Sequence, residues 1–383
     1  MPAAYRHVYV HVPFCARRCV YCDFAIAVRA RVPVDDYVAG VRAELTARLG
    51  AAPLASDRPA ISTLYFGGGT PSRLGGDGLA RLVDTARDWF AFDAGAEVTA
   101  EANPDDVTPN VVAAWRAAGV NRLSLGAQTF DAGALAWMRR SHADDVAERA
   151  VDLARAGGIE DVSLDLIFAL PAGVPRDLDH DLARLVALEP SHVSIYGLTV
   201  EPGTPLGRHA TRQPVAEADE DRYASEFLAA HDALAGAGFE HYEVSNFARP
   251  GCRARHNSAY WTGASYLGLG PSAHGFDGHT RRWNEPAYAR WLPRVAGGAD
   301  PVAGCDPIDD DARRVEAVYL GLRTIDGLTL RAGERERVAR WVAAGWATLD
   351  DADLGGPRAR LTPLGWLRLD ALAADLTAFR SRW

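Results

Sequence analysis

The sequence predicts an α/β fold: a partial (β/α)6-type barrel followed by a small, mainly helical C-terminal domain of winged-helix-like shape. Three observations lead to this prediction. Six short apolar runs alternate with amphipathic helical stretches between residues 8 and 237. The runs are almost continuously apolar, as in strands that are covered on both faces. Polar residues follow several of them in turn. Successive β–α units imply right-handed crossovers and a parallel sheet, open or curled into a partial barrel.

The elements follow from apolar periodicity and from helix start signals. We expect strands at 8–12, 61–66, 97–101, 122–125, 162–170 and 193–200. We expect helices after Asp35-Asp36 and at 79–90, 111–118, 144–156, 178–188 and 217–237.

Three parts are expected along the chain. Residues 1–245 form the barrel, and residues 246–305, rich in Gly, Pro, Arg and aromatic side chains, form an irregular segment packed on it. Residues 306–383 form the small domain, with helices at 310–322, 331–344 and 363–380 and a short strand pair.

Bulk properties exclude several classes of protein. The 383 residues carry a net charge of -9, which argues against a nucleic-acid binder that works by neutralising phosphates. Every basic side chain other than histidine is an arginine, since the sequence contains no lysine. No apolar run approaches the roughly 18 residues of a membrane helix, and no signal peptide precedes the first cysteines. We therefore expect a cytoplasmic protein, with Cys252 and Cys305 as unpaired thiols of a reducing compartment.

Three of the five cysteines, Cys15, Cys19 and Cys22, stand in a C-x3-C-x2-C array after the first expected strand. Three thiolates so close together suit a soft metal or an iron–sulfur cluster. A tetrahedral zinc site needs a fourth ligand, and a disulfide framework needs pairs. Buried structural cysteines would be scattered. Three ligands on a four-iron cluster leave one iron open for chemistry or an exchangeable ligand.

Polar residues gather at the expected strand ends, which meet at one rim of such a fold. Gly67-Gly68-Gly69-Thr70-Pro71 follows the second strand, where it is either a flexible turn or a close approach to a ligand. Glu101 is either a solvated carboxylate or a ligand contact, and Gln128 offers a donor and an acceptor. Asp165 lies inside an apolar strand and needs a partner or a ligand. Arg140 is either a surface arginine or a carboxylate clamp. Together these residues describe a polar, zwitterionic ligand beside the cluster.

The cysteine array and the glycine run resemble the radical S-adenosylmethionine (radical SAM) superfamily. More narrowly, a set of motifs resembles the oxygen-independent coproporphyrinogen III oxidase family, and within it the HemW haem-chaperone branch. These motifs are Tyr9-Val-His-Val-Pro-Phe-Cys15, Gly67-Gly-Gly-Thr-Pro71, Glu101-Ala-Asn-Pro, Gly126-Ala-Gln128, Asp165-Leu-Ile, Leu198-Thr-Val-Glu-Pro-Gly-Thr-Pro205 and His256-Asn-x-x-Tyr-Trp261. The resemblance spans nearly the whole chain, and it implies a HemN_C-like domain at 306–383.

The resemblance implies a [4Fe–4S] cluster on Cys15, Cys19 and Cys22, with S-adenosylmethionine on the fourth iron through its amino and carboxylate groups. By position, the residues that match S-adenosylmethionine contacts are Tyr9, Gly68, Gly69, Thr70, Glu101, Gln128, Arg140 and Asp165. The chaperone branch further implies haem as cofactor and cargo, and acceptor apo-haemoproteins as partners. A membrane-associated acceptor is one option within that class.

Two departures separate a chaperone from an oxidase. The oxidases carry a further cysteine two residues after the third, whereas Phe24 stands there in this chain. They also have an N-terminal extension, whereas 14 residues precede Cys15 here. We therefore expect a haem carrier on a radical-SAM scaffold, without catalytic residues for coproporphyrinogen oxidation. The alternative is the oxidase, which decarboxylates coproporphyrinogen III to protoporphyrinogen IX.

His256 has two interpretations, an axial haem ligand or a structural histidine. His274 and Cys252 are further candidates for haem contact.

Overall fold

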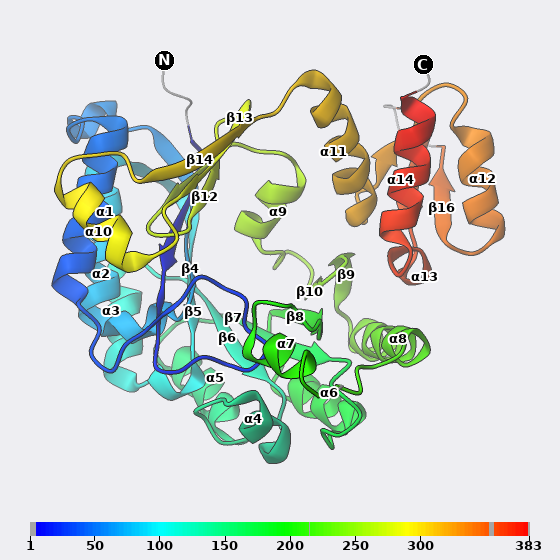
Figure 1. The fold of residues 1–383 in the computed structure, drawn as a ribbon, viewed down its shortest axis with the longest axis horizontal. Helices are drawn as coiled ribbons and strands as arrows, with labels where there is room; N and C mark the ends of the chain where they lie inside the picture. Colours follow the sequence, from blue (N-terminus) through cyan, green and yellow to red (C-terminus); the bar gives the residue numbers. More distant parts are fainter. Residues whose placement is uncertain (1–4, 214, 352–355, 382–383) are drawn as a thin grey trace. The chain divides into compact units, whose positions relative to one another are not determined.

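The computed structural model describes residues 5–213, 215–351 and 356–381 (Figure 1). The chain divides into two compact units, each made of two separate stretches of sequence. The first unit comprises Met1–Ala218 and Ser265–Pro307, and the second comprises Asp219–Ala264 and Ile308–Trp383. Every residue expected at the cluster or at S-adenosylmethionine belongs to the first unit.

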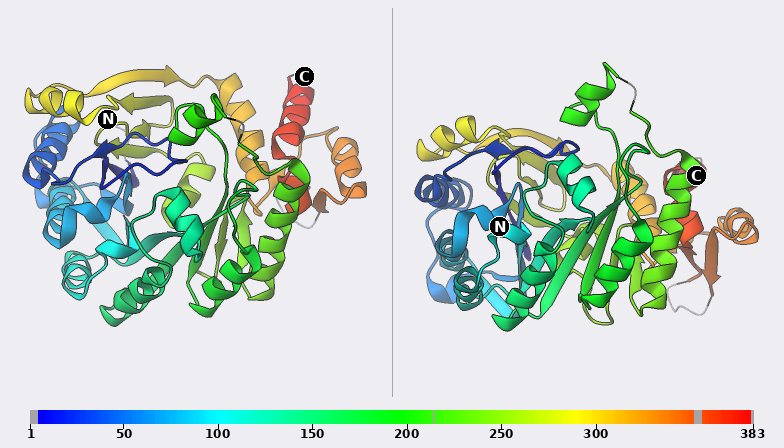
Figure 2. Two further views of the ribbon diagram at one scale, coloured as in Figure 1. Left: turned by 60° about the horizontal axis from the view of Figure 1, so that its bottom comes forward. Right: turned by 90° about the horizontal axis from the view of Figure 1, so that it is seen from below.

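A parallel sheet forms the centre of the first unit. Its strands occur in the order β11-β1-β4-β5-β6-β7-β8, and each neighbouring pair is parallel. Their bounds are β1 His7–Val12, β4 Ala60–Gly68, β5 Ala91–Ala102, β6 Arg122–Gln128, β7 Asp161–Phe168, β8 His192–Gly197 and β11 Tyr266–Leu269. All six expected strands are present, and the predicted α/β fold with a parallel sheet is confirmed. The sheet curves as a partial barrel does (Figure 2).

Most of the helices that follow the strands lie around the outside of the sheet (Figure 1), whereas the last, short one projects away from it (Figure 2). They are α1 Val34–Leu49, α2 Gly75–Trp89, α3 Pro109–Ala118, α4 Ala132–Met138, α5 Val146–Ala156, α6 Leu178–Ala187 and α7 Pro205–Ala210. Side-chain caps set several of their starts: Thr108 accepts from the Val111 amide and Asp177 from the His180 amide. Helices α4 and α7 were not expected, because each is too short to show a helical period.

Buried side chains of the strands form the core of the first unit. In β7 both faces are covered, since the consecutive residues Val162, Ser163 and Leu164 are each at most 1% exposed. On one face of β1 and β4, Val8, Val10, Leu64 and Phe66 are each at most 2% exposed. Apolar burial on this scale is the main driving force for folding. The near-continuous apolar runs of the sequence reflect this double coverage.

The structure differs from expectation in residues 246–305, which were expected to be irregular. Four strands extend the sheet beyond β1, and the last three pair antiparallel. They are β11, β12 His274–Phe276, β13 Thr280–Asn284 and β14 Val302–Pro307, and α10 Tyr288–Ala296 lies between the last two. These strands lie toward one edge of the sheet, where one face is exposed to solvent. Glycine, arginine and half-buried aromatic side chains therefore replace the regular alternation of apolar and polar residues that would have identified the strands.

A buried carboxylate fastens this extension to α1. Glu44 is 0% exposed and accepts hydrogen bonds from the Gly270 amide (2.9 Å), the Trp291 indole (2.9 Å) and the Asn284 side chain (2.7 Å). It also pairs with Arg48 at 3.1 Å. Four donors offset the cost of burying the charge.

The second unit contains a long helix, a β-hairpin and the C-terminal elements. These elements are α8 Glu220–Gly236, β9 Glu240–Glu243, β10 Asn246–Ala248, α9 Arg255–Trp261, α11 Asp310–Arg323, α12 Arg335–Ala343, α13 Pro363–Trp366 and α14 Leu369–Arg380. A three-stranded antiparallel sheet, β15-β17-β16, joins Leu328–Thr329, Arg358–Leu361 and Ala347–Asp350. The expected helix at 363–380 is thus divided into α13 and α14. The expected boundaries at 245 and 305 stay a prediction.

None of the helices described here is long and apolar enough to cross a membrane.

Candidate functional site

One cavity of about 420 Å³ lies at the ends of strands β4 to β8 in the first unit. Three elements line it: the loop around the three cysteines, the glycine run after β4, and the last residues of β5 to β8. Of the twelve residues expected at the site, ten line this cavity: Cys15, Cys19, Cys22, Gly68, Gly69, Thr70, Glu101, Gln128, Arg140 and Asp165. Parallel strand ends therefore meet here as expected.

Cys15 ends the short strand β2 Phe14–Cys15, and Cys19 and Cys22 stand on the loop that joins it to its partner strand β3 Ala27–Val28. The Cys22 amide donates to the Cys19 carbonyl at 3.4 Å, which forms a turn between the second and third cysteines. Cys15 Sγ and Thr70 Oγ1 lie 3.4 Å apart, so the first thiol reaches the glycine run. The loop thus presents all three sulfurs to one cavity.

Burial favours the protonated thiol at two of the three cysteines when no metal is bound. Burial raises the pKa of Cys15, and it raises the pKa of Cys22 to about 11. Metal binding needs thiolates, so iron must displace these protons. Within the described ranges, no three or more His, Cys, Asp or Glu side chains are grouped as ligands of one ion. Three soft sulfurs on a single cavity wall fit a polynuclear iron–sulfur cluster, in which each thiolate binds a different iron.

Two glycines let the end of β4 lie against the end of β1. Gly68 has a φ of +110°, and a Cβ there would lie 2.5 Å from the His11 ring. A Cβ at Gly69 would lie 2.7 Å from the Pro13 backbone. Burial lowers the pKa of His11 to about 4, so its ring is neutral as it packs here. Close packing within the protein therefore requires glycine at both positions, in addition to any ligand contact.

Glu101 and Asp165 are half-buried carboxylates that both line the cavity. Glu101 accepts from the Tyr65 hydroxyl at 2.9 Å and from the Gly68 amide at 3.0 Å. Burial, reinforced by Asp165, nevertheless raises the pKa of Glu101 to about 7. Burial also raises the pKa of Asp165 to about 6, against hydrogen bonds from Ser194 and Ser124. Such displaced pKa values are typical of groups that await a ligand.

Arg140 extends from the end of α4 to the cysteine loop. Its Nη2 donates to Asn103 Oδ1 at 2.6 Å and to the Gly126 carbonyl at 2.7 Å, and Nη1 lies 3.8 Å from Cys19 Sγ. Its Nε is buried and has no hydrogen-bond partner among the described residues. A buried donor of this kind favours an added acceptor such as a carboxylate.

Gln128 ends β6 in the left-handed region, with a φ of 70°. Strain of this kind at a non-glycine residue often accompanies functional sites. The conformation places the side-chain amide beside Gly126, where a Cβ would lie 2.8 Å from Gln128 Nε2.

Two of the twelve residues lie elsewhere. Tyr9 is in β1, stacks on Tyr65 with ring centroids 6.0 Å apart, and meets His11 Nδ1 through its hydroxyl at 3.1 Å. It is not among the residues that line the cavity. His256 lies in α9 of the second unit, is 1% exposed, and has its Nε2 2.9 Å from the Tyr260 hydroxyl.

The two further haem candidates are also placed. His274 is exposed and stacks on Trp283 in the first unit, and Cys252 lies in the second unit.

Sequence reasoning missed the residues that support the carboxylates. Tyr65, Ser124 and Ser194 hold Glu101 and Asp165 in place. Ser124 and Ser194 are polar residues within apolar strands. The same signal identified Asp165, so it could have identified both serines. Tyr65 carried no such signal, because a tyrosine is common in strands.

Comparison with known proteins gives consistent results. Residues 9–188 match the Radical SAM superfamily. A protein of Mycobacterium tuberculosis named heme chaperone HemW is 42% identical over 382 residues, covering 98% of this chain and 96% of that protein. A protein of the same name from Escherichia coli is 38% identical over 269 residues, covering 70% and 69%. A mouse protein named radical S-adenosyl methionine domain-containing protein 1, mitochondrial, is 34% identical and covers 84% and 74%.

Among solved structures, coproporphyrinogen III oxidase (HemN) from Escherichia coli, described as a radical SAM enzyme, superposes with a TM-score of 0.80. The match covers 97% of this chain and 90% of that one at 22% identity, which shows a common fold.

Proposed function

Because this chain belongs to the HemW heme chaperone family, within the radical SAM superfamily, we propose that it binds haem and transfers it to acceptor apo-proteins. In this proposal the chain carries a [4Fe–4S] cluster and S-adenosylmethionine. One observation supports the cofactors above all: three thiols, two half-buried carboxylates and a half-buried arginine line the same cavity. The family supports the haem function.

Cys15, Cys19 and Cys22 hold three irons of the cluster in this proposal, and the fourth iron takes the amino and carboxylate groups of S-adenosylmethionine. When reduced, such a cluster supplies an electron to S-adenosylmethionine. Arg140 lies beside Cys19 and has an unused Nε, so it suits a ligand carboxylate. Glu101, Asp165 and Gln128 provide acceptors and a donor on the wall formed by the strand ends.

Tyr9 remains a proposed contact of S-adenosylmethionine, although its hydroxyl meets His11 in the protein without ligand. A contact from Tyr9 requires the ring to turn from His11 toward the cavity.

His256 remains a proposed haem ligand. Its imidazole is buried and bonded to Tyr260, so iron could bind only after that hydrogen bond is released. The observed contact equally suits a structural histidine. The variant His256→Ala distinguishes the two roles, because only a ligand role changes the haem spectrum of a protein that remains folded.

The oxidase is the competing function. The fold of HemN is shared, but a fold does not determine an activity. At the position of the oxidases' further cysteine, Phe24 lines the cavity and is 58% exposed. We propose that the chain does not oxidise coproporphyrinogen III. Formation of protoporphyrinogen IX in an anaerobic assay with reductant and S-adenosylmethionine would overturn this part.

Haem titration of anaerobically purified protein tests the main proposal. We expect a stoichiometric shift of the Soret band, followed by haem transfer to an apo-haemoprotein. If wild-type protein binds no haem, the chaperone function is refuted.

The cluster has a separate test with a matched control. Reconstituted Cys19→Ser protein should lose most of its iron and visible absorbance, whereas Cys252→Ser protein, altered in the second unit, should keep both. Four irons retained in Cys19→Ser would contradict the assignment. Acceptors, including a membrane-associated one, belong to the proposal and can be sought by haem transfer to candidate apo-proteins.

A further inference from the structure

A second cavity, of about 480 Å³, lies in the first unit next to the cysteine loop. Its apolar wall consists of Val20 from that loop, Trp137 from α4, and Pro205 and Leu206 from α7. This volume lies within the roughly 300–1,000 Å³ of small-molecule and cofactor sites. Nothing in the proposed cluster or S-adenosylmethionine binding uses this cavity.

The polar part of the wall is entirely basic. Arg139, Arg208 and Arg212 line the cavity, and no acidic residue does. All three are exposed, and none forms an ion pair with a carboxylate in the described ranges. Surface arginines elsewhere in the unit do meet carboxylates, as Arg42 meets Asp88 at 2.7 Å. Three uncompensated guanidinium groups in a chain of net charge -9 favour an anionic ligand.

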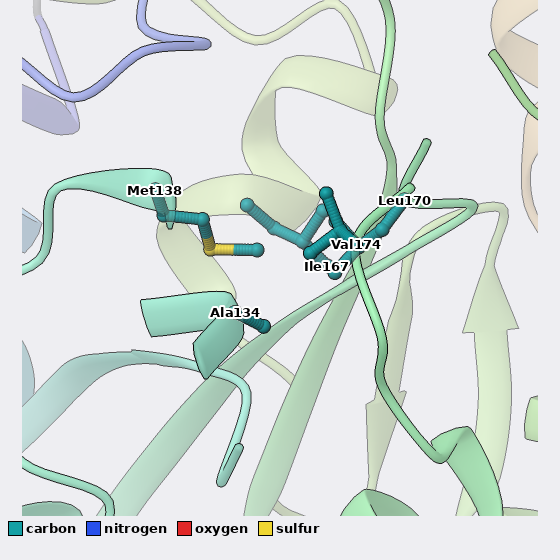
Figure 3. Packing of buried hydrophobic residues seen from close by; sticks show 5 residues of the cluster. All are labelled: Ala134, Met138, Ile167, Leu170 and Val174. Carbon is teal, nitrogen blue, oxygen red and sulfur yellow. The ribbon is translucent and has the colours of Figure 1, made fainter. Parts of the chain in front are cut away.

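The cavity rests on a rigid base. Five buried side chains, two of them from α4, pack together (Figure 3). Trp137 and Tyr21 pack against this cluster. The five are Ala134, Met138, Ile167, Leu170 and Val174. The apolar wall is therefore positioned by the core of the unit and does not depend on a surface loop alone.

Hydrogen bonds connect this cavity to the cysteine loop. The Val20 amide donates to the Met138 carbonyl at 3.3 Å, and the Val20 carbonyl accepts from the Leu206 amide at 2.8 Å. Val20 directly follows Cys19, and Arg139 lines both this cavity and the one that contains the cysteines. A ligand in the second cavity would thus contact the loop that holds the cluster.

We propose that this second cavity is the haem-docking site, an inference that rests on the proposed haem-carrier function. Haem has a flat apolar face and two propionates, and the cavity has an apolar wall bordered by three arginines. The macrocycle lies against Val20, Trp137 and Leu206, and its propionates pair with the arginines. Because the arginines are exposed, the propionate edge stays open to water, which allows a carrier to release its cargo.

His209 provides an imidazole at the same place. It lies in α7, lines the cavity and is exposed. An exposed imidazole can bind iron without leaving a packed site, whereas His256 would first have to release its bond to Tyr260. At this docking site His209 is therefore the axial ligand, and the assignment replaces the one proposed above for His256.

Haem titration of arginine variants tests the docking site. The variant Arg139→Gln/Arg208→Gln/Arg212→Gln should bind haem at least about tenfold more weakly, equivalent to about 1.4 kcal/mol. A control with the same change in charge, Arg149→Gln/Arg290→Gln/Arg294→Gln, should bind like wild type. The dimethyl ester of haem, which lacks the two carboxylates, should bind equally weakly to wild type and to the triple variant.

The ligand assignment has its own measurement. In His209→Ala protein the Soret band of bound haem should move, and the haem iron should lose its low-spin character. In His256→Ala protein the haem spectrum should stay unchanged. The double variant Arg208→Gln/Arg212→Gln leaves Arg139 of the cysteine cavity in place; it should keep its cluster iron, as an intact protein does, and should still bind haem more weakly than wild type.

The outcomes separate two kinds of failure. If wild-type protein binds no haem, the proposed function itself fails. If wild type binds haem and the triple variant binds within twofold of it, the docking site is wrong while the function stands. If the dimethyl ester binds wild type as tightly as haem does, propionate pairing is refuted.

Discussion

The half-buried carboxylate of Glu101 should make the free energy of unfolding of the cluster-free protein fall as the pH rises. In the folded chain, burial raises the pKa of Glu101 from 4.5 to about 7. Between these two pH values the folded state therefore holds a proton on Glu101 that the unfolded state has released. The contribution of the protonated carboxyl to the free energy of unfolding is fully present below pH 4.5, and it is lost as the pH rises through 7. At 1.36 kcal/mol per pKa unit, the loss amounts to about 3 kcal/mol.

The variant Glu101→Gln isolates this contribution, because its side chain has similar size and cannot ionise. Urea-induced unfolding, followed by circular dichroism between pH 4.5 and 8, gives the unfolding free energy of both proteins. We expect the wild-type value to fall relative to the variant by about 3 kcal/mol over this range. Asp165 also has a raised pKa, but it is present in both proteins and largely cancels in the difference.

Glu160→Gln serves as the control, since Glu160 is an exposed carboxylate of the same unit. Its unfolding free energy should run parallel to that of wild type at all pH values. If the unfolding free energies of Glu101→Gln and wild type also run parallel with pH, Glu101 ionises in the folded protein at no cost in stability. That result would refute the reasoning.

Three further substitutions test the framework. Glu44→Ala should lower the unfolding free energy by about 3–5 kcal/mol in urea titrations, because it leaves Arg48 buried without its carboxylate; a loss below 1 kcal/mol would contradict this. Gly68→Ala should lower the free energy of unfolding by about 1–3 kcal/mol, because Gly68 has a positive φ and the His11 imidazole lies beside it. The control Gly173→Ala, where a Cβ meets nothing within 4 Å, should leave the melting temperature almost unchanged. Thr108→Ala removes the cap of α3 and should cost about 1 kcal/mol, and equal melting temperatures for variant and wild type would count against the cap.

The sequence was sufficient to predict the parallel sheet and the rim of the site. Strands covered on both faces leave unbroken apolar runs, so β4 and β7 could be recognised directly. Parallel topology then places their ends together, which is why Glu101 and Asp165 were expected in one cavity. The cysteine spacing singled out the loop that is proposed to hold the cluster, without any knowledge of the fold.

Other features could not be predicted for physical reasons. Strands β12 and β13 have few buried side chains, and β13 reads as Thr-Arg-Arg-Trp-Asn, so neither shows an apolar alternation. The basic cavity combines residues from three distant stretches of sequence, around Val20, Arg139 and Arg208. No local pattern links them, because only the packed structure brings them together.

The position of β1 has a consequence for synthesis on the ribosome. β1 pairs with β4 on one side and with β11 on the other. About 200 residues separate the end of β4 from β11, which at roughly 5–20 residues per second corresponds to about 10–40 s of translation. During that interval one edge of β1 has no strand to pair with, and an unpaired edge invites association with other chains. Nascent chains should therefore be most prone to aggregate before β11 has emerged, and chaperones that bind the nascent chain during that interval would matter most for this protein.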